Sequence, residues 1–305
     1  MSPDLKIKIA GVEFANPVMT ASGCAGYGEE LSQFYPLSKL GALVTKSITR
    51  NSRAGHPPPR TVETPGGMLN AIGLANVGID RFLSEKIPFL NKQETKIIVN
   101  VAGSTINEYV EVCSRLADCE RVDMVELNIS CPNVDEGGIE FGSNTEMTEK
   151  SLREVRKVFK KPIIAKLAPN VTSVVDIAKA AEQGGADALS LINSVIGTAV
   201  DIDTWQPLLT NITGGLTGPA IKPIALAIVN DVYNNCELPI IGIGGITNYE
   251  DVVQYMLYGA TAVQVGTALF VDPTTPLKII DGLKKYLKSK KLKSVKDLIG
   301  KVKKR

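Results

Sequence analysis

The sequence predicts an α/β fold of the (β/α)8 barrel class, the TIM barrel. Short β-branched runs recur eight times, stretches of helical period lie between them, and neither a linker nor a shift in composition divides the chain. Several runs are apolar almost throughout, as expected for parallel strands that are buried on both faces. We therefore expect a single domain over residues 1–305 rather than two doubly wound domains.

The predicted elements alternate regularly along the chain. Strands are expected at residues 17–21, 42–47, 96–101, 124–129, 162–167, 188–193, 239–244 and 262–267. The clearest helices are expected at residues 106–116, 145–159, 174–183, 224–233 and 249–258. Glycines follow two of these helices, at Gly184, Gly185 and Gly259, and mark turns into the next strand.

Polar side chains stand at the carboxyl ends of the predicted strands. They are three asparagines and two lysines, Asn100, Asn128, Asn193, Lys46 and Lys166. A plain hydrophobic core has no use for them, because buried polar groups cost stability unless they are hydrogen-bonded. Barrel enzymes build their active sites at this end of the barrel, so we expect the site there.

Cys131 is the first candidate for chemistry. It follows a predicted strand, Pro132 ends that strand, and asparagines stand on both sides, in the segment Asn128-Ile129-Ser130-Cys131-Pro132-Asn133. The thiolate of a cysteine at a polar rim can act as a base or a nucleophile. The alternative is a small buried apolar residue, which is the interpretation that we favour for Cys113 and Cys119.

Glycine-rich turns follow the last two predicted strands. Gly244 ends the seventh strand and Gly245 follows it, and Gly266 and Thr267 end the eighth. Such turns leave backbone N–H groups accessible, and barrels commonly bind phosphate at this position. A third glycine-rich turn is expected at residues 213–219. The sequence therefore predicts a bound phosphate, carried by a cofactor or by a substrate.

The two strand-end lysines admit several functions. Lys166 could form a Schiff base, contact a flavin or extend outward into solvent, and its position within a strand disfavours the last. Lys46 has the same ambiguity and could also pair with an anionic substrate. His56, the only histidine, stands in a proline-rich loop and is expected to be structural or exposed. Without a second histidine, catalytic triads of the Ser-His type and His-rich metal sites are poorly supported, and no metal site is predicted.

Composition excludes several classes of protein. The net charge of +2 gives no field strong enough to suggest nucleic acid. The N-terminus lacks the apolar region of a signal peptide, and no stretch approaches the ~20 apolar residues of a membrane span. Five scattered cysteines argue against a disulfide framework. We expect a soluble cytoplasmic protein that binds neither membrane nor nucleic acid.

The C-terminal tail is rich in lysine. Residues 284–305 carry eleven basic residues and one acid, interrupted by apolar residues. We expect a solvated helical face there, with binding of an anionic partner as the alternative.

Several motifs together resemble those of the dihydroorotate dehydrogenase family. The resemblance covers about residues 9–286 and includes the segment around Cys131, Thr45-Lys46-Ser47, Pro57-Pro58-Pro59-Arg60, Asn70-Ala71-Ile72-Gly73-Leu74, Ile192-Asn193-Ser194 and Ile243-Gly244-Gly245-Ile246. A cysteine rather than a serine at the base position resembles the soluble class 1 enzymes. Residues 21–28 and 167–172 look more like class 1B than the fumarate-using class 1A.

This resemblance implies FMN-dependent oxidation of (S)-dihydroorotate to orotate in de novo pyrimidine (UMP) biosynthesis. Cys131 would be the base that removes a proton from the ring carbon next to a carbonyl, while the neighbouring carbon gives hydride to the flavin. FMN contacts would fall on Ser22, Lys46, Ser47, Asn100, Asn128, Lys166, Ile192, Gly218, Gly244, Gly245, Gly266 and Thr267. Substrate contacts would fall on Lys46, Asn70, Ala71, Ile72, Gly73, Leu74, Asn128, Asn193 and Ser194.

The resemblance also implies a partner. Class 1B enzymes pass electrons to NAD through a second subunit that carries FAD and a 2Fe-2S cluster, in a heterotetramer of two plus two subunits. Iron–sulfur ligation needs clustered cysteines, whereas the cysteines of this chain are scattered. Both groups are therefore expected on the partner.

Other functions stay open beside this one. A class 1A-type enzyme would use fumarate as the electron acceptor. A phosphate-binding lyase or aldolase would use Lys166 or Lys46 as a Schiff base, but it leaves Cys131 and the asparagines unexplained. A non-catalytic flavin- or phosphate-binding barrel is the remaining alternative. For an enzyme, the glycines within residues 132–142 predict a loop that closes over bound substrate.

Overall fold

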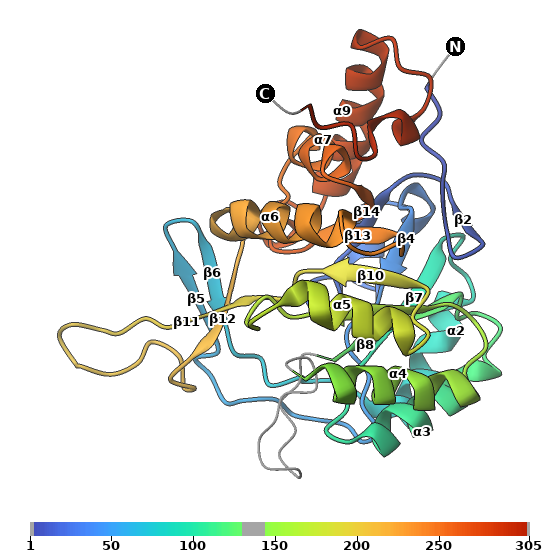
Figure 1. Cartoon of the computed structure of the whole chain (residues 1–305). Coiled ribbons are helices and arrows are strands. Elements are labelled where there is room, and N and C mark those ends of the chain that lie inside the picture. Colours follow the sequence, from blue (N-terminus) through green and yellow to red (C-terminus); the bar gives the residue numbers. More distant parts are fainter. Residues whose placement is uncertain (1–2, 130–143, 304–305) are drawn as a thin grey trace.

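Eight parallel strands close into a barrel in the computed structural model, which describes residues 3–129 and 144–303. In chain order around the barrel, each strand pairs with the next, and the last pairs with the first (Figure 1). The barrel strands are β3 (Val18–Thr20), β4 (Ala42–Val44), β7 (Lys96–Val101), β8 (Met124–Asn128), β9 (Ile163–Leu167), β10 (Ala188–Leu191), β13 (Ile240–Ile243) and β14 (Ala260–Val265). The predicted (β/α)8 class is confirmed, and each predicted strand overlaps an observed one.

Helices follow the strands and cover the outside of the barrel (Figure 1). The longer ones are α3 (Ile106–Ala117), α4 (Thr145–Val158), α5 (Val174–Gln183), α6 (Lys222–Tyr233), α7 (Tyr249–Leu257) and α9 (Thr275–Ser289). Short helices complete the set, α1 (Gly78–Arg81), α2 (Ile87–Leu90) and α8 (Ala268–Val271). The five predicted helices are confirmed to within a few residues.

Side-chain caps begin four of these helices and explain where they start. The side chains of Thr105, Asn144, Ser173 and Asn248 each accept a hydrogen bond from a backbone N–H in the first turn of α3, α4, α5 and α7. These residue types are preferred at the position before a helix, since their oxygens satisfy N–H groups that lack a helical partner. At the other end of α5, Gly185 has a φ of +94°, as expected for a glycine that closes a helix.

A four-stranded antiparallel sheet lies beside the barrel and was not predicted. Its order is β11-β12-β6-β5, from β5 (Thr61–Thr64), β6 (Gly67–Asn70), β11 (Val195–Gly197) and β12 (Gly214–Thr217). Figure 1 shows it at the left edge of the barrel, with the β11–β12 connection projecting away. The turn expected at residues 213–219 is wrong in part, because residues 214–217 are the strand β12, stabilised by pairing with β6. A further hairpin joins β1 (Ile7–Ile9) and β2 (Val12–Phe14).

The C-terminal region packs onto the barrel near the N-terminus (Figure 1). Leu287, Val295 and Leu298 are buried in the main core, while Lys284, Lys285 and Lys288 are exposed. The prediction of a solvated basic helical face is confirmed for this part of α9. Within residues 3–129 and 144–303, no helix combines the length and the apolar character that crossing a membrane requires.

Candidate active site

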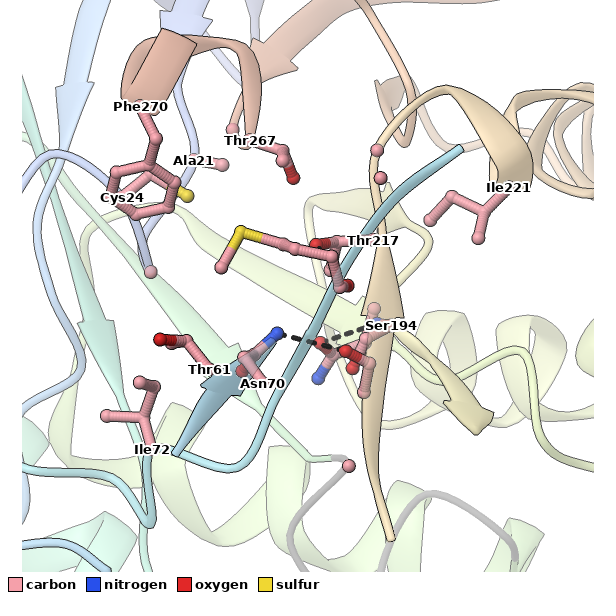
Figure 2. Close-up of a pocket in the computed structure, with 18 of the residues that line it drawn as sticks. Ala21, Cys24, Thr61, Asn70, Ile72, Ser194, Thr217, Ile221, Thr267 and Phe270 are labelled. Atoms are coloured by element: carbon pink, nitrogen blue, oxygen red, sulfur yellow. Dashed lines mark hydrogen bonds between the residues drawn. The ribbon is translucent and has the colours of Figure 1, made fainter. Parts of the chain in front are cut away.

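A large pocket opens at the carboxyl ends of the barrel strands. Its volume is ≈ 1280 Å³, and the four-stranded sheet contributes to its wall beside the strand-end loops. A pocket for one small ligand occupies about 300–1,000 Å³, so this one has room for a cofactor together with a substrate. Figure 2 shows Ala21, Cys24 and Phe270 at one side of the pocket, with Asn70 and Ser194 close together at another.

Nearly all the predicted site residues line this one pocket. From the strand ends and the loops after them these are Ser22, Lys46, Ser47, Asn128, Lys166, Ile192, Asn193, Ser194, Gly218, Gly244, Gly245, Gly266 and Thr267. The segment Asn70, Ala71, Ile72, Gly73 and Leu74 lines it as well. Asn100 is fully buried and is not part of the lining. Cys131 and the predicted loop at 132–142 lie outside the described residues.

The two glycine-rich turns at the pocket present free backbone donors. Within the described part of the chain, the N–H groups of Gly244, Gly245, Ile246, Gly266 and Thr267 have no hydrogen-bond acceptor. Buried backbone N–H groups in proteins are nearly always bonded, so such a cluster is suited to an anionic ligand. Gly245 has a φ of +65°, and an added Cβ would lie 2.8 Å from the Lys222 Cβ, so only glycine fits there.

The two lysines of the pocket differ in their partners. Lys166 Nζ donates to Ser22 Oγ over 3.1 Å and lies 3.7 Å from a carboxylate oxygen of the buried Glu126. Lys46 forms no ion pair among the residues that the structure describes. Burial lowers the pKa of Lys46, and the nearby Arg60 lowers it further, against smaller opposing effects of Glu30 and Cys24. Lys46 is thus a half-buried cation without an ion-pair partner in the described chain, which is the arrangement that an anionic ligand would complete.

Amide side chains form a second polar group in the pocket. Asn193 Nδ2 donates to Asn128 Oδ1 over 3.3 Å, and Asn193 Oδ1 accepts a hydrogen bond of 2.8 Å from the Ser194 N–H. Asn70 Nδ2 donates to the Gly215 carbonyl over 3.1 Å, which ties β6 to β12 at the pocket (Figure 2). Each amide keeps further donor or acceptor capacity for a ligand.

His56 holds the segment that contains Ala71 and Ile72. Its Nδ1 lies 3.0 Å from the Ala71 carbonyl oxygen, and its backbone N–H donates to the Ile72 carbonyl. These contacts agree with the structural alternative of the prediction that His56 is structural or exposed, and the ring also lines the pocket.

A family model for dihydroorotate dehydrogenase matches residues 4–287 of this chain. The chain belongs to the dihydroorotate dehydrogenase family. Membership confirms the resemblance drawn from the strand-end motifs, and the matched range agrees closely with the range over which those motifs extend.

Curated relatives of the family match over almost their whole length. The chain is 52% identical over 301 residues to a protein of Geotalea daltonii, covering 99% of each chain. It is 51% identical over 298 residues to one of Citrifermentans bemidjiense, covering 98% of each. A protein of Alkaliphilus oremlandii is 48% identical over 299 residues, which are 98% of this chain and 99% of the relative. All three carry the name "Dihydroorotate dehydrogenase B (NAD(+)), catalytic subunit".

The site of this dihydroorotate dehydrogenase family member contains residues that sequence reasoning missed. Cys24 lines the pocket, and burial raises its pKa to about 11, against opposing effects of Lys166 and Lys46, so its thiol is neutral near pH 7. Cys24 stands shortly after the first predicted strand, and this position in the sequence could have indicated that it lines the pocket. Thr61 and Met68 from the unpredicted sheet line the pocket with no comparable signal. Glu126, a charged residue inside an apolar strand, was visible in the sequence but was not interpreted.

Proposed function

We propose that this chain is the catalytic subunit of an NAD-linked dihydroorotate dehydrogenase, which oxidises (S)-dihydroorotate to orotate in de novo pyrimidine biosynthesis. The observation that carries the proposal is a convergence in one pocket. Lys46, which has no ion-pair partner among the described residues, lies there with the paired amides of Asn128 and Asn193 and with two turns whose N–H groups have no described acceptor. The names of the relatives support the same reaction.

FMN fits the residues present in the pocket. Its phosphate would be held by the free N–H groups at Gly244, Gly245 and Gly266, and the ring would lie near Lys166 at the barrel mouth. Further contacts are proposed from Ser22, Lys46, Ser47, Asn128, Ile192, Gly218 and Thr267. Asn100 would act indirectly, since it accepts a 2.6 Å hydrogen bond from the Ser47 hydroxyl at the pocket wall. When bound, FMN supplies the acceptor for the two electrons that the substrate loses.

The substrate is a flat ring with two carbonyls, two N–H groups and a carboxylate. Lys46 would pair with the carboxylate, since it is the pocket lysine without an ion-pair partner in the described chain. Asn128, Asn193 and Ser194 would bond the ring polar groups, because amides both donate and accept. The segment Asn70, Ala71, Ile72, Gly73 and Leu74 would form the wall of the substrate subsite.

Cys131 is the proposed catalytic base. The strand β8 ends at Asn128, which lines the pocket, and Cys131 follows shortly after it in sequence. As a thiolate it would take the proton from the ring carbon next to a carbonyl, which leaves the substrate ready to lose hydride from the neighbouring carbon. The described cysteine of the pocket, Cys24, is a poorer candidate because its pKa is raised to about 11.

A partner subunit is part of the proposal. The relatives are named as catalytic subunits, which implies a second subunit in those proteins. We propose that this chain pairs with an electron-transfer subunit carrying FAD and a 2Fe-2S cluster, in a heterotetramer of two plus two.

The described cysteines, Cys24, Cys113, Cys119 and Cys236, are all free thiols, which supports a reducing, cytoplasmic location. A single domain over residues 1–305 stays a prediction.

The Schiff-base alternative is weakened by the surroundings of Lys166. Its Nζ donates to Ser22 Oγ and lies 3.7 Å from the buried Glu126 carboxylate, so these contacts hold the amine that a Schiff base would need free to attack a carbonyl. Lys46 has a lowered pKa, but it lines the same pocket as amides that suit a ring substrate rather than an aldol acceptor.

The test is to purify the chain and to identify any bound chromophore. We expect a yellow protein that releases FMN on denaturation and whose flavin absorbance bleaches when dihydroorotate is added without oxygen. A colourless protein that traps a carbonyl substrate on borohydride reduction would refute the proposal in favour of the Schiff-base lyase.

A further inference from the structure

Glu126 is a buried carboxylate that the proposed function does not use. It lies on β8 with 0% exposure, and the strand register pairs it with Asn100 of β7. The same register places Asn128 beside Lys166 of β9, so these side chains share the interior face of the barrel. A charge in such a position is costly unless it is paired and hydrogen-bonded.

Three neighbouring side chains satisfy this carboxylate. Asn100 Nδ2 donates to Oε1 over 2.7 Å, and Gln264 Nε2 donates to Oε2 over 2.5 Å. Lys166 Nζ lies 3.7 Å from Oε1. Four strands, β7, β8, β9 and β14, therefore meet at one carboxylate directly behind the pocket lysine.

Lys166 connects this buried group to the pocket. Its side chain lines the pocket, and among the described residues its Nζ has one hydrogen-bond partner, Ser22 Oγ at 3.1 Å, and one ion-pair partner, the Glu126 carboxylate. Within the described chain, Glu126 is thus the only ion-pair partner of this ammonium. The carboxylate controls both where the ammonium sits and how much net positive charge the pocket receives from it.

We propose that Glu126 is a positioning residue that acts through Lys166 to set the reduction potential of the bound flavin. The proposal rests on the proposed function, because the group that senses the charge is FMN. A cation beside a flavin stabilises the reduced ring, which carries negative charge. A carboxylate next to that cation cancels part of its effect. The reduction potential of the flavin is therefore lower than it would be beside a lysine without an ion-pair partner.

The substitution Glu126→Gln removes the charge while keeping the shape. The side-chain oxygen of the introduced glutamine can still accept a hydrogen bond from Asn100, while its NH2 group, facing Gln264, needs an acceptor. Gln264 can supply this acceptor if its own amide group flips, because its Oε1 is buried without a partner among the described residues. The substitution therefore changes the electrostatics with little change in packing.

The experiment measures the midpoint potential of bound FMN by equilibration with reference dyes. The proteins are the wild type, Glu126→Gln, Glu126→Asp and the double variant Glu126→Gln/Lys166→Gln. We expect Glu126→Gln to raise the potential, with the ratio of reduced to oxidised flavin at a fixed poise rising about tenfold, or ~30 mV for a two-electron couple. The midpoint potential of Glu126→Asp, which keeps the charge, should lie between those of Glu126→Gln and the wild type. The potential of the double variant should be lower than that of the wild type, because the double variant lacks the cation.

An unchanged or lowered potential in Glu126→Gln, with FMN bound, would overturn the inference and leave the proposed function intact. Absence of FMN from the wild type would instead overturn the proposed function.

If Glu126→Gln does not fold, the double variant carries the test, and a potential at or above that of the wild type would overturn the inference. Thermal unfolding of the FMN-free proteins gives a second readout. The double variant should unfold at a higher temperature than Lys166→Gln, which leaves the Glu126 charge buried and unpaired. A double variant less stable than Lys166→Gln would show that the ion pair does not exist.

Discussion

Residues of one type differ in function here because of what lies next to them. Lys166 is held by a buried carboxylate and a hydroxyl, whereas Lys46 has no ion-pair partner in the described chain. The first can tune a cofactor and the second can bind an anion. Cys24 lines the pocket and Cys113 is buried in the main core, yet desolvation raises the pKa of both, so both are neutral thiols near pH 7.

Cys131 provides the first prediction. Cys131→Ala should retain FMN but slow its reduction by dihydroorotate on the order of 10²–10⁴-fold, the usual contribution of a positioned base. Stopped-flow bleaching of the flavin measures the rate. Cys119→Ala, on the outside of the barrel, is the matched control and should behave as the wild type. An unimpaired Cys131→Ala would rule out the assignment.

Lys46 provides the second prediction, on orotate binding. Lys46→Met should weaken orotate affinity by about 2 kcal/mol, or roughly thirtyfold, since a charge-assisted bond is lost. Because the pKa of Lys46 is lowered, wild-type affinity should fall with rising pH earlier than for an ordinary lysine. In the variant this dependence should disappear. Titration of the flavin spectrum with orotate at several pH values checks both effects, and a variant with wild-type affinity would exclude Lys46 from the substrate subsite.

At the scale of the elements, the turn before α7 is fixed by one buried carboxylate. Asp251 accepts hydrogen bonds from the N–H and hydroxyl of Thr247 and from the Nζ of Lys222. It also completes a capping box with Asn248. These contacts hold together the start of α6, the start of α7 and the turn that carries the free N–H groups of Gly244 and Gly245.

Asp251→Asn should destabilise the fold by about 2 kcal/mol, because it leaves Lys222 unpaired. Burial raises the pKa of Asp251, but the hydrogen bonds from Lys222 and Thr247 outweigh burial and lower it. A lowered pKa in the folded state gives stability that is present above the unfolded pKa of ~3.9 and is lost as pH falls through the folded value.

Thermal unfolding from pH 7 downward measures this contribution. The difference between the wild type and Asp251→Asn should shrink at the acidic end. Asp281→Asn removes an exposed ion pair with Lys284 and should change little. A constant difference across the whole range would contradict the pKa argument.

Gly218 provides a prediction about the packing between the end of β12 and the start of β6. Its φ is +96°, and an added Cβ would lie 2.6 Å from the Gly67 Cα. Gly218→Ala therefore forces the residues after β12 away from β6. We expect a loss of about 1–3 kcal/mol in unfolding free energy, together with weaker FMN binding. Gly23→Ala, whose Cβ would meet nothing within 4 Å, is the control for stability. Equal melting temperatures of the two variants would contradict the packing argument.

At the scale of the whole molecule, the proposed function requires electrons to leave a flavin at the barrel mouth. The cysteines of the chain are scattered, and the barrel strands with their helices account for most of its length. We predict that the isolated chain reduces an artificial dye with dihydroorotate but not NAD, and that adding the partner subunit restores NAD reduction.

The assay compares dye, fumarate and NAD as acceptors for the same preparation. Rapid NAD reduction by the chain alone would refute the requirement for a partner. Rapid fumarate reduction would instead assign the protein to the class 1A type.

The sequence by itself determined the barrel and most of the residues that line its pocket. Strands such as Ile163–Leu167 are buried on both faces and apolar except for Lys166, and helices such as Val174–Gln183 have a helical period, so both follow from local pattern. In a parallel barrel all the carboxyl ends meet at one rim, so Lys46, Asn128 and Lys166 could be placed together without coordinates.

Only the tertiary structure decided which distant segments meet. Asn70 bonds Gly215 across 145 positions, and that pairing makes the sheet at the pocket wall from strands too short and too rich in glycine to predict. Gln264 reaches Glu126 across 138 positions in the barrel interior. Local pattern reports whether a residue faces a core, but the partner of a buried polar group depends on register and closure, which the chain acquires only when the strands pair.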